Sequence, residues 1–337
     1  MFSKCLRSEN HKMKCKVALG AILLAGAFML PTAEAVAEYP ERTVHIIVQY
    51  PPGGTPDMVA RLLADRYSKK FGKPFVVENR PGASGNIATR YVAKSKPDGY
   101  TLLLASDGPI TIAPTLQKNM TYDPIAELTP VTLAATSAFA LLTSSSNSVN
   151  SVKDLIARAK ANPGKLNYAS PGIGTQHHLA AELLKTIGKI DIVHVPYKGF
   201  APGTVDVISG QVEMVFGSVP ASVKYVKGGK MKALAVTGER RFSGMSSVPT
   251  MMESGLPNYN ITAWYGLMAP TGTPRTIIDK INAESSNILA NEDVIKMLEA
   301  RGLDVVAGGP DAYAKRIKAD VEAWGKIIKD ANVKVGK

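Results

Sequence analysis

Two short glycine-rich segments carry the residue types that could hold a small anion. The first spans residues 51–57, reads PPGGTPD, and lies between an apolar run and an amphipathic helical pattern. A strand, a glycine turn and a helix start together leave several backbone N–H groups without partners, and the positive end of the helix dipole lies beside them. Such donors suit a carboxylate or another anion.

Each residue of this first turn has an expected role. Pro52 stiffens the approach, and Gly53 and Gly54 let the backbone come close to a ligand. Thr55 or Asp57 can cap the helix that follows. Asp57 would weaken the preference for an anion unless its carboxylate turns toward its own helix. An ordinary tight turn between a strand and a helix would have the same sequence, so one such turn alone does not define a site.

The second segment, residues 170–176, repeats the same logic with the sequence SPGIGTQ. Hydroxyl and amide donors come from Ser170, Thr175 and Gln176, whereas Gly172 and Gly174 remove side-chain bulk. The spacing lacks the third glycine of a dinucleotide-binding fingerprint, so it gives little support to NAD binding. Two such turns in one chain predict a two-lobed receptor for a small anionic solute.

Other polar residues are weaker candidates. His177 could face a bound acid, whereas His178 is expected to be a structural hydrogen-bonding residue. Asp206 and Lys198 could orient a loop or help to bind a solute, and a structural ion pair is an equally good reading. The sequence contains no nucleophile elbow, phosphate loop or HExxH motif, and its histidines lack metal-like spacing. We therefore predict no catalytic residue, no metal and no cofactor.

The elements that would position these residues alternate between short apolar runs and helical patterns. The expected strands are rich in Val, Ile and Leu, as is typical of strands covered on both faces; they are 44–50, 74–78, 101–106, 166–170, 192–196, 212–217 and 233–237. The expected helices are 57–71, 152–161, 176–187, 274–290 and 311–331. This order predicts an α/β fold with parallel, doubly wound sheets.

The chain is long enough for two lobes. The Ser-rich segment 143–148 and the extended segment 259–269 are the places where it could cross between them. We then expect lobe one to comprise 38–142 and 266–337, and lobe two to comprise 143–265. A single sheet with surface loops at these places fits the composition equally well.

The first 37 residues are typical of a signal peptide. A basic segment precedes the apolar run 17–30, and both Ala33-Glu34-Ala35 and Ala35-Val36-Ala37 fit a cleavage site. The alternative is that the segment is an uncleaved membrane anchor, but the apolar run is short for a stable one. Cleavage near Ala35–Ala37 would release the protein into the periplasm. Because the only cysteines, Cys5 and Cys15, precede the cut, the mature protein would have no disulfide.

The basic balance of the chain does not indicate a nucleic-acid partner. The formal charge is +12, and removal of residues 1–37, which carry five Lys or Arg and two Asp or Glu, leaves +9. The basic residues are dispersed over helix faces rather than gathered in one block. A generally positive surface would weakly favour the arrival of anionic solutes.

Several longer motifs resemble the Bug family, the substrate-binding receptors of tripartite tricarboxylate transporters. The resemblance runs from about residue 39 to the C-terminus. The motifs that carry it are Tyr50–Asp57, Val77–Gly85, Pro97–Leu103, Tyr168–Thr175 followed by His178–Ala180, His194–Gly199, Val248–Thr250 with Glu253–Gly255, and Trp264–Leu267 with Ala269–Pro270.

This resemblance implies a type II periplasmic binding-protein fold with two lobes, each a doubly wound and mainly parallel sheet, and a solute in the cleft between them. It implies that the two glycine turns hold a ligand carboxylate, partly through ordered waters. The residues carried over are Pro52, Gly53, Gly54, Thr55, Ser170, Gly172, Gly174 and Thr175. The positions that fall where the family's variable ligand contacts lie are Ser106, Asp107, Gln176, His177, Phe216, Gly217 and Ser218.

Two positions of the resemblance bear on specificity. Many family members have Asp where Gly217 stands, so the resemblance implies a lost polar contact and room for a bulkier ligand, such as an aromatic acid. Asp206 matches a family Asp near the wall of lobe two, where it could meet an amino group.

The leading hypothesis is a monomeric extracytoplasmic receptor, not an enzyme. It would deliver a small carboxylic acid, either a dicarboxylate or an aromatic carboxylate, to the membrane permease subunits of a tripartite tricarboxylate transporter. Three alternatives stay open: a receptor for an amino-bearing or neutral solute, a sensory binding module, and an exported enzyme that uses His177 or Asp206 as a base.

Overall fold

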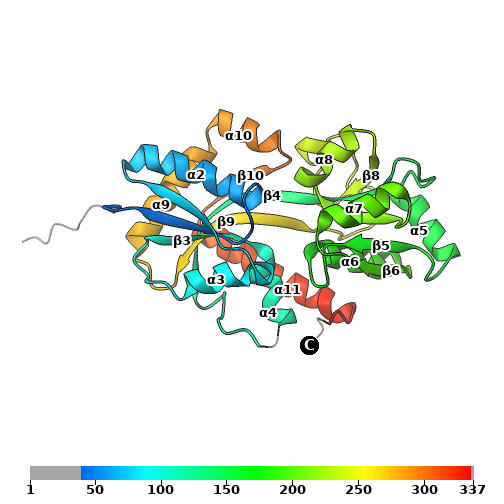
Figure 1. Cartoon of the computed structure of the whole chain (residues 1–337), viewed down its shortest axis with the longest axis horizontal. Helices are drawn as coiled ribbons and strands as arrows, with labels where there is room; N and C mark the ends of the chain where they lie inside the picture. The colour runs from blue at the N-terminus through cyan, green and yellow to red at the C-terminus, as the bar shows by residue number, and fades with distance from the viewer. Residues whose placement is uncertain (1–38, 118, 335–337) are drawn as a thin grey trace, which may run out of the picture. The chain divides into compact units, whose positions relative to one another are not determined.

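The structure is a computed structural model that describes residues 39–117 and 119–334. The predicted signal peptide lies outside these residues. Residues 40–337 form one compact unit. Among the described residues of this unit, a shared strand joins two α/β lobes (Figure 1). The predicted α/β class is therefore confirmed.

The first lobe is built on the parallel strands β2, β1 and β3, and the first glycine turn follows β1. Together with the antiparallel strands their order is β2-β1-β3-β9-β4, and β10 also pairs with β4. These strands are β1 (Val44–Val48), β2 (Phe75–Asn79), β3 (Thr101–Ser106), β4 (Leu128–Ser144), β9 (Thr262–Pro270) and β10 (Asp304–Gly308). The α-helices of this lobe are α2 (Thr55–Phe71), α3 (Asn86–Ala93), α4 (Ala113–Leu116), α9 (Arg275–Leu289), α10 (Glu292–Glu299) and α11 (Pro310–Asp330).

The second lobe repeats the plan with its own parallel strands. β6, β5 and β7 lie side by side and parallel, and the end of β4 pairs antiparallel with β7 on one side and β8 on the other. The strands are β5 (Asn167–Ser170), β6 (Val193–Pro196), β7 (Met214–Ser218) and β8 (Met231–Val236). The helices are α5 (Val152–Ala161), α6 (Gln176–Gly188), α7 (Phe200–Ser209) and α8 (Val219–Lys227).

Strand β4 carries the chain from one lobe into the other. It pairs with β9 up to Ala138 and with β7 from Phe139 onward. The buried Thr237 joins the outgoing and returning chains: its hydroxyl accepts the Phe139 N–H at 2.9 Å and donates to the Ile261 carbonyl oxygen at 2.5 Å. The exchange of sheets at 138/139 lies four residues before the expected limit at 142/143, and the limits of the lobes stay a prediction.

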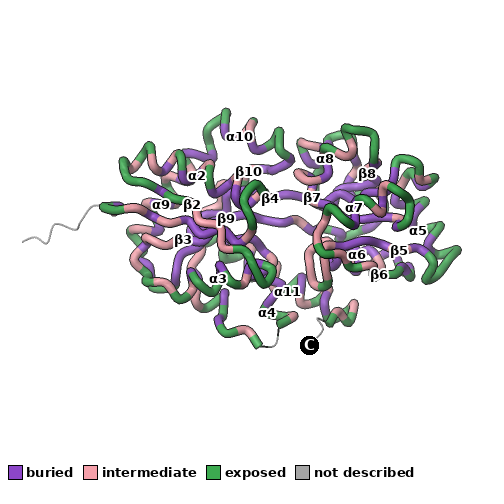
Figure 2. Tube along the Cα trace, viewed as in Figure 1, coloured by how far each residue is buried: buried purple, intermediate pink, exposed green. Residues whose placement is uncertain are grey.

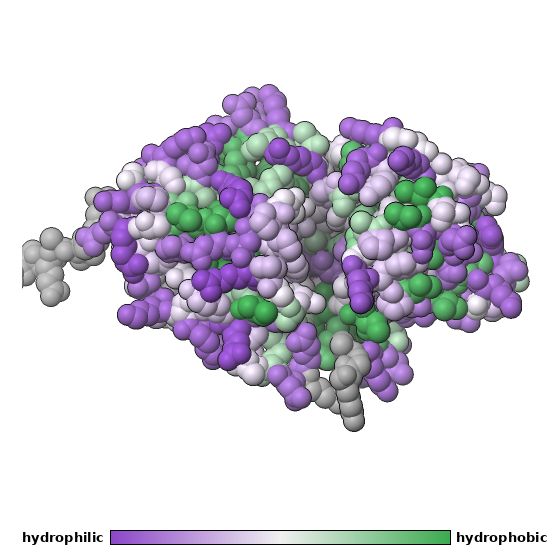
Figure 3. All heavy atoms as spheres, viewed as in Figure 1, coloured by the Kyte–Doolittle hydropathy of each residue, from purple (hydrophilic) through white to green (hydrophobic). Residues whose placement is uncertain are grey.

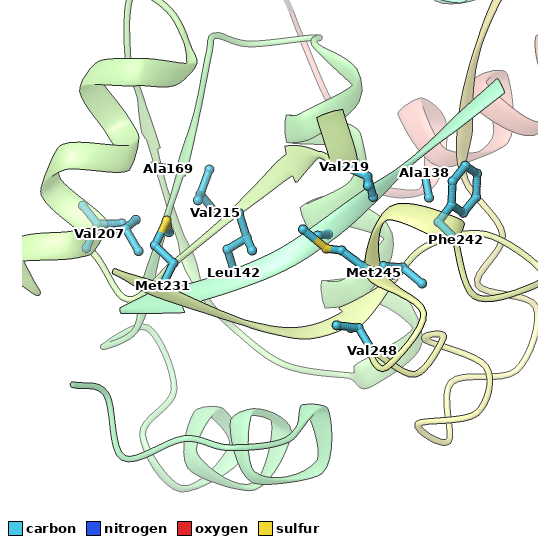
Figure 4. Close-up of a cluster of buried hydrophobic side chains, with 13 residues drawn as sticks. Ala138, Leu142, Ala169, Val207, Val215, Val219, Met231, Phe242, Met245 and Val248 are labelled. Carbon is cyan, nitrogen blue, oxygen red and sulfur yellow. The ribbon is translucent and has the colours of Figure 1, made fainter. Parts of the chain in front are cut away.

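Each lobe has its own apolar core beneath helices that are exposed on their outer faces (Figure 2). In lobe one, Trp264 lies edge-on to Tyr313 of α11, with ring centroids 5.0 Å apart. In lobe two, Val215, Leu142 and Met231 lie in a cluster formed between the sheet and α7 and α8 (Figure 4). These cores fix the strand ends from which the candidate site residues project.

Candidate functional site

The first glycine turn is closed by its own aspartate. Gly53 has a φ of 86°, a conformation that favours glycine, and its N–H donates to Asp57 Oδ2 at 2.9 Å. Asp57 is buried and also accepts hydrogen bonds from Arg61 and Asn79. Burial acts to raise the pKa of Asp57, but the hydrogen bonds from Arg61, Gly53 and Asn79 hold it below its usual value. The carboxylate therefore faces its own turn and is charge-compensated by Arg61.

Two donors of this turn stay open at the start of α2. Gly54 is the N-cap residue and has no side-chain cap, so the predicted capping by Thr55 or Asp57 at this position is wrong. Among the described residues, the N–H groups of Gly54 and Thr55 donate to no protein acceptor. Thr55 lies beside Tyr265 of β9, where it acts to lower the pKa of Tyr265 against the larger effect of burial. Pro52 is exposed at the tip of the turn.

A buried polar wall lies beside this turn, where β1 and β3 end. Ser106 is held by Gln49, whose Oε1 accepts from both the Ser106 N–H and the Ser106 hydroxyl at 2.9 Å. The Tyr50 hydroxyl lies 3.4 Å from Ser106 Oγ, and burial raises the pKa of Tyr50 to about 12. Tyr265 pairs with Ser106 across the sheet. Sequence reasoning did not include Tyr50 and Tyr265 as site residues, although Tyr50 directly precedes the turn.

Asp107 is the one buried carboxylate of this wall. It is fully buried, and its Oδ1 has no hydrogen-bond partner among the described residues. Burial raises the pKa of Asp107 well above its usual value, Asp320 adds to the shift, and Arg316 opposes it. Its other oxygen accepts a hydrogen bond from the side-chain amide of Gln176, which belongs to the second lobe. This contact joins the two lobes directly.

The second glycine turn uses two of its donors internally. The Gly172 N–H donates to Ser170 Oγ at 3.1 Å, and the Gly174 N–H donates to His178 Nδ1 at 3.1 Å. Thr175 is the N-cap of α6, and its hydroxyl accepts from the His178 N–H at 3.4 Å. Three predicted N–H donors, those of Gly53, Gly172 and Gly174, are thus occupied by side chains of the protein.

The open donors of the second turn lie one step later, at the start of α6. In the ranges that the structure describes, the N–H groups of Gln176 and His177 donate to no protein acceptor. A series of contacts connects them with the first turn: Thr55 with Tyr265, Tyr265 with Ser106 across the sheet, and Asp107 with Gln176. The surface is hollowed between the two lobes (Figure 3).

An aromatic group flanks the second turn. The His177 ring lies edge-on to Phe139, with centroids 5.0 Å apart, and 5.9 Å from Phe200. Burial lowers the pKa of His177 to about 4, so the ring is neutral at pH 7.

Gly217 does not open room for a ligand, and the expectation that it would is wrong. A Cβ added at Gly217 would lie 2.5 Å from both the Phe200 ring and Ser222 Oγ. Phe200 therefore fills the space that a side chain at Gly217 would need. Phe216 is fully buried in β7, with its ring 6.3 Å from that of Tyr259.

The remaining charged candidates do not form the ion pair considered from the sequence. Asp206 accepts a hydrogen bond from the Tyr197 hydroxyl at 2.5 Å, and Lys198 is exposed. Within the ranges 39–117 and 119–334, no cluster of three His, Cys, Asp or Glu side chains could hold a metal ion. None of the helices in those ranges is both long and apolar enough to span a bilayer.

Two pockets lie in the first lobe, away from the glycine turns. One, of about 310 Å³, is almost entirely apolar and lies between α11 and the strands, with Leu128, Met268 and Ile317 in its lining. The other, of about 540 Å³, lies beside α3 and includes Arg90 and Tyr91. None of the predicted site residues lines either pocket.

Comparison with known proteins places this arrangement in a family. Residues 59–333 match the family described as tripartite tricarboxylate transporter family receptor, TctC. The chain belongs to this family. Protein BugT of Bordetella pertussis is similar, with 34% identity over 298 residues that cover 88% of this chain and 91% of BugT. The TctC family comprises periplasmic solute-binding receptors, which confirms the family predicted from the motifs.

Solved structures support the same assignment for the TctC fold. Rpa4515 of R. palustris, solved with adipate, is 36% identical, superposes with a TM-score of 0.80, and covers 88% of this chain and 99% of its own. MatC of Rhodopseudomonas palustris, solved with bound malate, is 31% identical with a TM-score of 0.74, and the match covers 86% of this chain and all of MatC. The predicted two-lobed binding-protein fold is thereby confirmed.

Proposed function

We propose that this TctC-family protein is a monomeric periplasmic receptor for a small carboxylic acid, either a dicarboxylate or an aromatic carboxylate. It would deliver that acid to the permease subunits of a tripartite tricarboxylate transporter after export and removal of residues 1–37. The receptor would act by binding and lobe closure, without catalysing a reaction.

The observation that carries this proposal is the pair of open helix starts. Gly54 and Thr55 at the start of α2, and Gln176 and His177 at the start of α6, present N–H groups without protein acceptors in the described chain. Each set lies at the positive end of a helix dipole, where a carboxylate is stabilised. Because the lobes meet at Asp107 and Gln176, one ligand could reach both sets, and closure would be linked to affinity.

Two further observations bear on the ligand. The neighbours solved with adipate and malate carry dicarboxylates, which supports this class for the present chain. The rings of Phe139, His177 and Phe200 beside the second turn support a ligand with an apolar or aromatic body. Asp107, with its unpaired oxygen, would favour a ligand that brings a hydrogen-bond donor, which keeps an amino-bearing acid as the second candidate.

A thermal-shift screen of the mature protein tests the proposal. The panel contains adipate, malate, benzoate and further mono- and dicarboxylates, with amino acids and nicotinamide as alternatives. A bound acid stabilises the folded state by mass action and so raises the melting temperature. At an acid concentration a hundredfold above Kd, the free energy of unfolding rises by about 2.7 kcal/mol. A flat response to every acid would contradict the proposal, and product formed from an acid would favour an enzyme.

A matched pair of variants locates the site. At Gly53 of the first turn, an added Cβ meets no protein atom within 4 Å. The side chain of Gly53→Val would therefore extend into the open space of the proposed site, and it should abolish the shift in melting temperature. Gly255→Val is the control, because Gly255 has a similar φ of 92° against 86° and equal space but lies outside the proposed site. Equal ligand shifts in both variants would exclude the first turn from the site.

A further inference from the structure

Two histidines form a stacked pair directly beneath the second glycine turn. The rings of His178 and His194 lie with centroids 4.1 Å apart and planes inclined by 24°. The ring of Tyr168 stacks on His194 at 4.9 Å. These residues come from α6, β6 and β5, so the pair lies where three elements of lobe two meet.

The hydrogen bond at His178 requires a neutral ring. Its Nδ1 accepts the Gly174 N–H at 3.1 Å, and a nitrogen that accepts cannot carry a proton. The proton of the neutral ring must therefore be on Nε2. Protonation of Nδ1 would set two N–H groups against each other and break the bond to the turn.

His194 acts on the same turn through a serine. Its Nε2 lies 2.6 Å from Ser170 Oγ, and this oxygen accepts the Gly172 N–H at 3.1 Å. Gly172 and Gly174 have φ values of 143° and 77°, which are not the ordinary extended or helical values. The two imidazoles thus hold both glycines of the turn, one directly and one through Ser170.

The charges that face the pair favour the neutral state. Glu182 Oε1 is 3.9 Å from His178 Nε2, which by itself would favour a protonated ring. That oxygen already accepts the Tyr168 hydroxyl at 2.5 Å and the Lys185 ammonium group at 3.0 Å. Lys185 therefore compensates Glu182, and each ring opposes a charge on the other because they are stacked.

We propose that His178 and His194 are positioning residues that, as neutral imidazoles, hold the second glycine turn in the shape that presents the Gln176 and His177 N–H groups to the ligand. This inference rests on the proposed function only for its effect on binding; the state of the two rings can be tested without a ligand.

The protonation equilibria agree with this geometry. Burial, with a contribution from Lys185, lowers the pKa of His178 to about 4. Burial, the neighbouring His178 and Lys185 lower the pKa of His194 to about 4, against the opposing effect of Glu182. Both rings are therefore neutral at pH 7, and the hydrogen bond from the Gly174 N–H to His178 is expected to be lost as the pH falls toward 4.

The first experiment reads the rings directly in the ligand-free mature protein. Long-range ¹H–¹⁵N correlation spectra of the imidazoles should show His178 as the neutral tautomer with its proton on Nε2 from pH 7 to 5. The Gly174 amide signal should shift in His178→Phe and stay near its native position in His178→Asn, whose side-chain oxygen can accept the same N–H. A protonated His178 at pH 6, or a proton on Nδ1, would overturn the proposal.

The second experiment measures binding with the acid that gives the largest thermal shift, by calorimetric titration at pH 7. His178→Phe fills the space but removes the acceptor, so it should bind about tenfold more weakly, while His178→Asn stays within about threefold of the native Kd. As the pH falls to 4, the affinity of the native protein for the acid should fall about twofold relative to that of His178→Asn, because half of the His178 side chains in the native protein are then protonated. The titration of the acid cancels in this ratio.

The outcomes separate this inference from the proposed function. If His178→Phe binds as tightly as the native protein, the positioning role is wrong, although the receptor function stands. If no acid binds to the native protein, the proposed function fails, and the spectra and the Gly174 signal still decide whether the rings hold the turn.

Discussion

Thr237 offers the sharpest test of how the two lobes are joined. Its hydroxyl accepts the Phe139 N–H at 2.9 Å and donates to the Ile261 carbonyl oxygen at 2.5 Å, and the residue is fully buried. Thr237→Val keeps the shape of the side chain but leaves both main-chain groups buried without a partner. Since each such group costs about 1–3 kcal/mol, we expect the two together to lower the free energy of unfolding by about 2–6 kcal/mol.

Thr237→Ser is the matched control because it keeps the hydroxyl and removes only a methyl group, at a cost of about 1 kcal/mol. Urea unfolding followed by circular dichroism measures both variants. With a slope of about 3 kcal/mol per molar urea, Thr237→Val should unfold at a midpoint lower by about 1–2 M. If the two variants are equally stable, the hydroxyl does not join the crossing strands and the reasoning is refuted.

Three further predictions concern single positions in the site region. Gly217→Ala should destabilise the protein by about 1–3 kcal/mol because its Cβ would meet the Phe200 ring; urea unfolding should show that Phe200→Leu in the same chain restores some of this loss. Asp107→Asn should raise the melting temperature at pH 7 but not at pH 3, because an acid whose pKa is raised by folding destabilises the protein as the pH rises above its unfolded value of 3.8. The histidine pair has the opposite pH dependence, because folding lowers the pKa of His178 and His194 from 6.5 to about 4. The free energy of unfolding should therefore be highest above pH 6.5 and decline toward pH 4. This decline should be smaller in His178→Asn.

Part of this fold was readable from the sequence, whereas the helices α3, α4, α7, α8 and α10 and the strands β4 and β10 were not among the expected elements. All seven expected strands and all five expected helices are present, with ends within two residues of the expectation. Their signals are local, because apolar runs such as 101–106 and glycine stops such as Gly72 lie within or directly beside the element itself.

The long strand β4 was not predicted, for a physical reason. Its sequence, LTPVTLAATSAFALLTS, mixes Ala, Thr and Ser with a proline and has no clear alternation. The register shifts between Pro130 and Thr132, where the proline interrupts the ladder. Its length comes from pairing with β9 in one lobe and with β7 and β8 in the other, and such non-local partners leave no local pattern.

The site was predicted at the level of the turns but not of their hydrogen bonds. The sequence identifies both glycine turns and the helix starts that follow them. It does not reveal that Asp57, Ser170 and His178 take three of the N–H groups, because this depends on side-chain rotamers. Nor does it reveal that Phe200, at the start of α7, fills the space at Gly217 in β7. The set of ligand-binding residues therefore stays a prediction. The N–H groups that are free to bind a ligand lie nearer the helix starts than the sequence predicted.

The central claim is that the starts of α2 and α6 together hold one carboxylic acid. The most direct measurement is a crystal structure of the mature protein with the acid that gives the largest thermal shift. We expect the acid between the lobes, with its carboxylate accepting hydrogen bonds, directly or through a water molecule, from Gly54 or Thr55 and from Gln176 or His177. An acid bound elsewhere, or held by one lobe alone with the other helix start occupied only by solvent, would contradict the account.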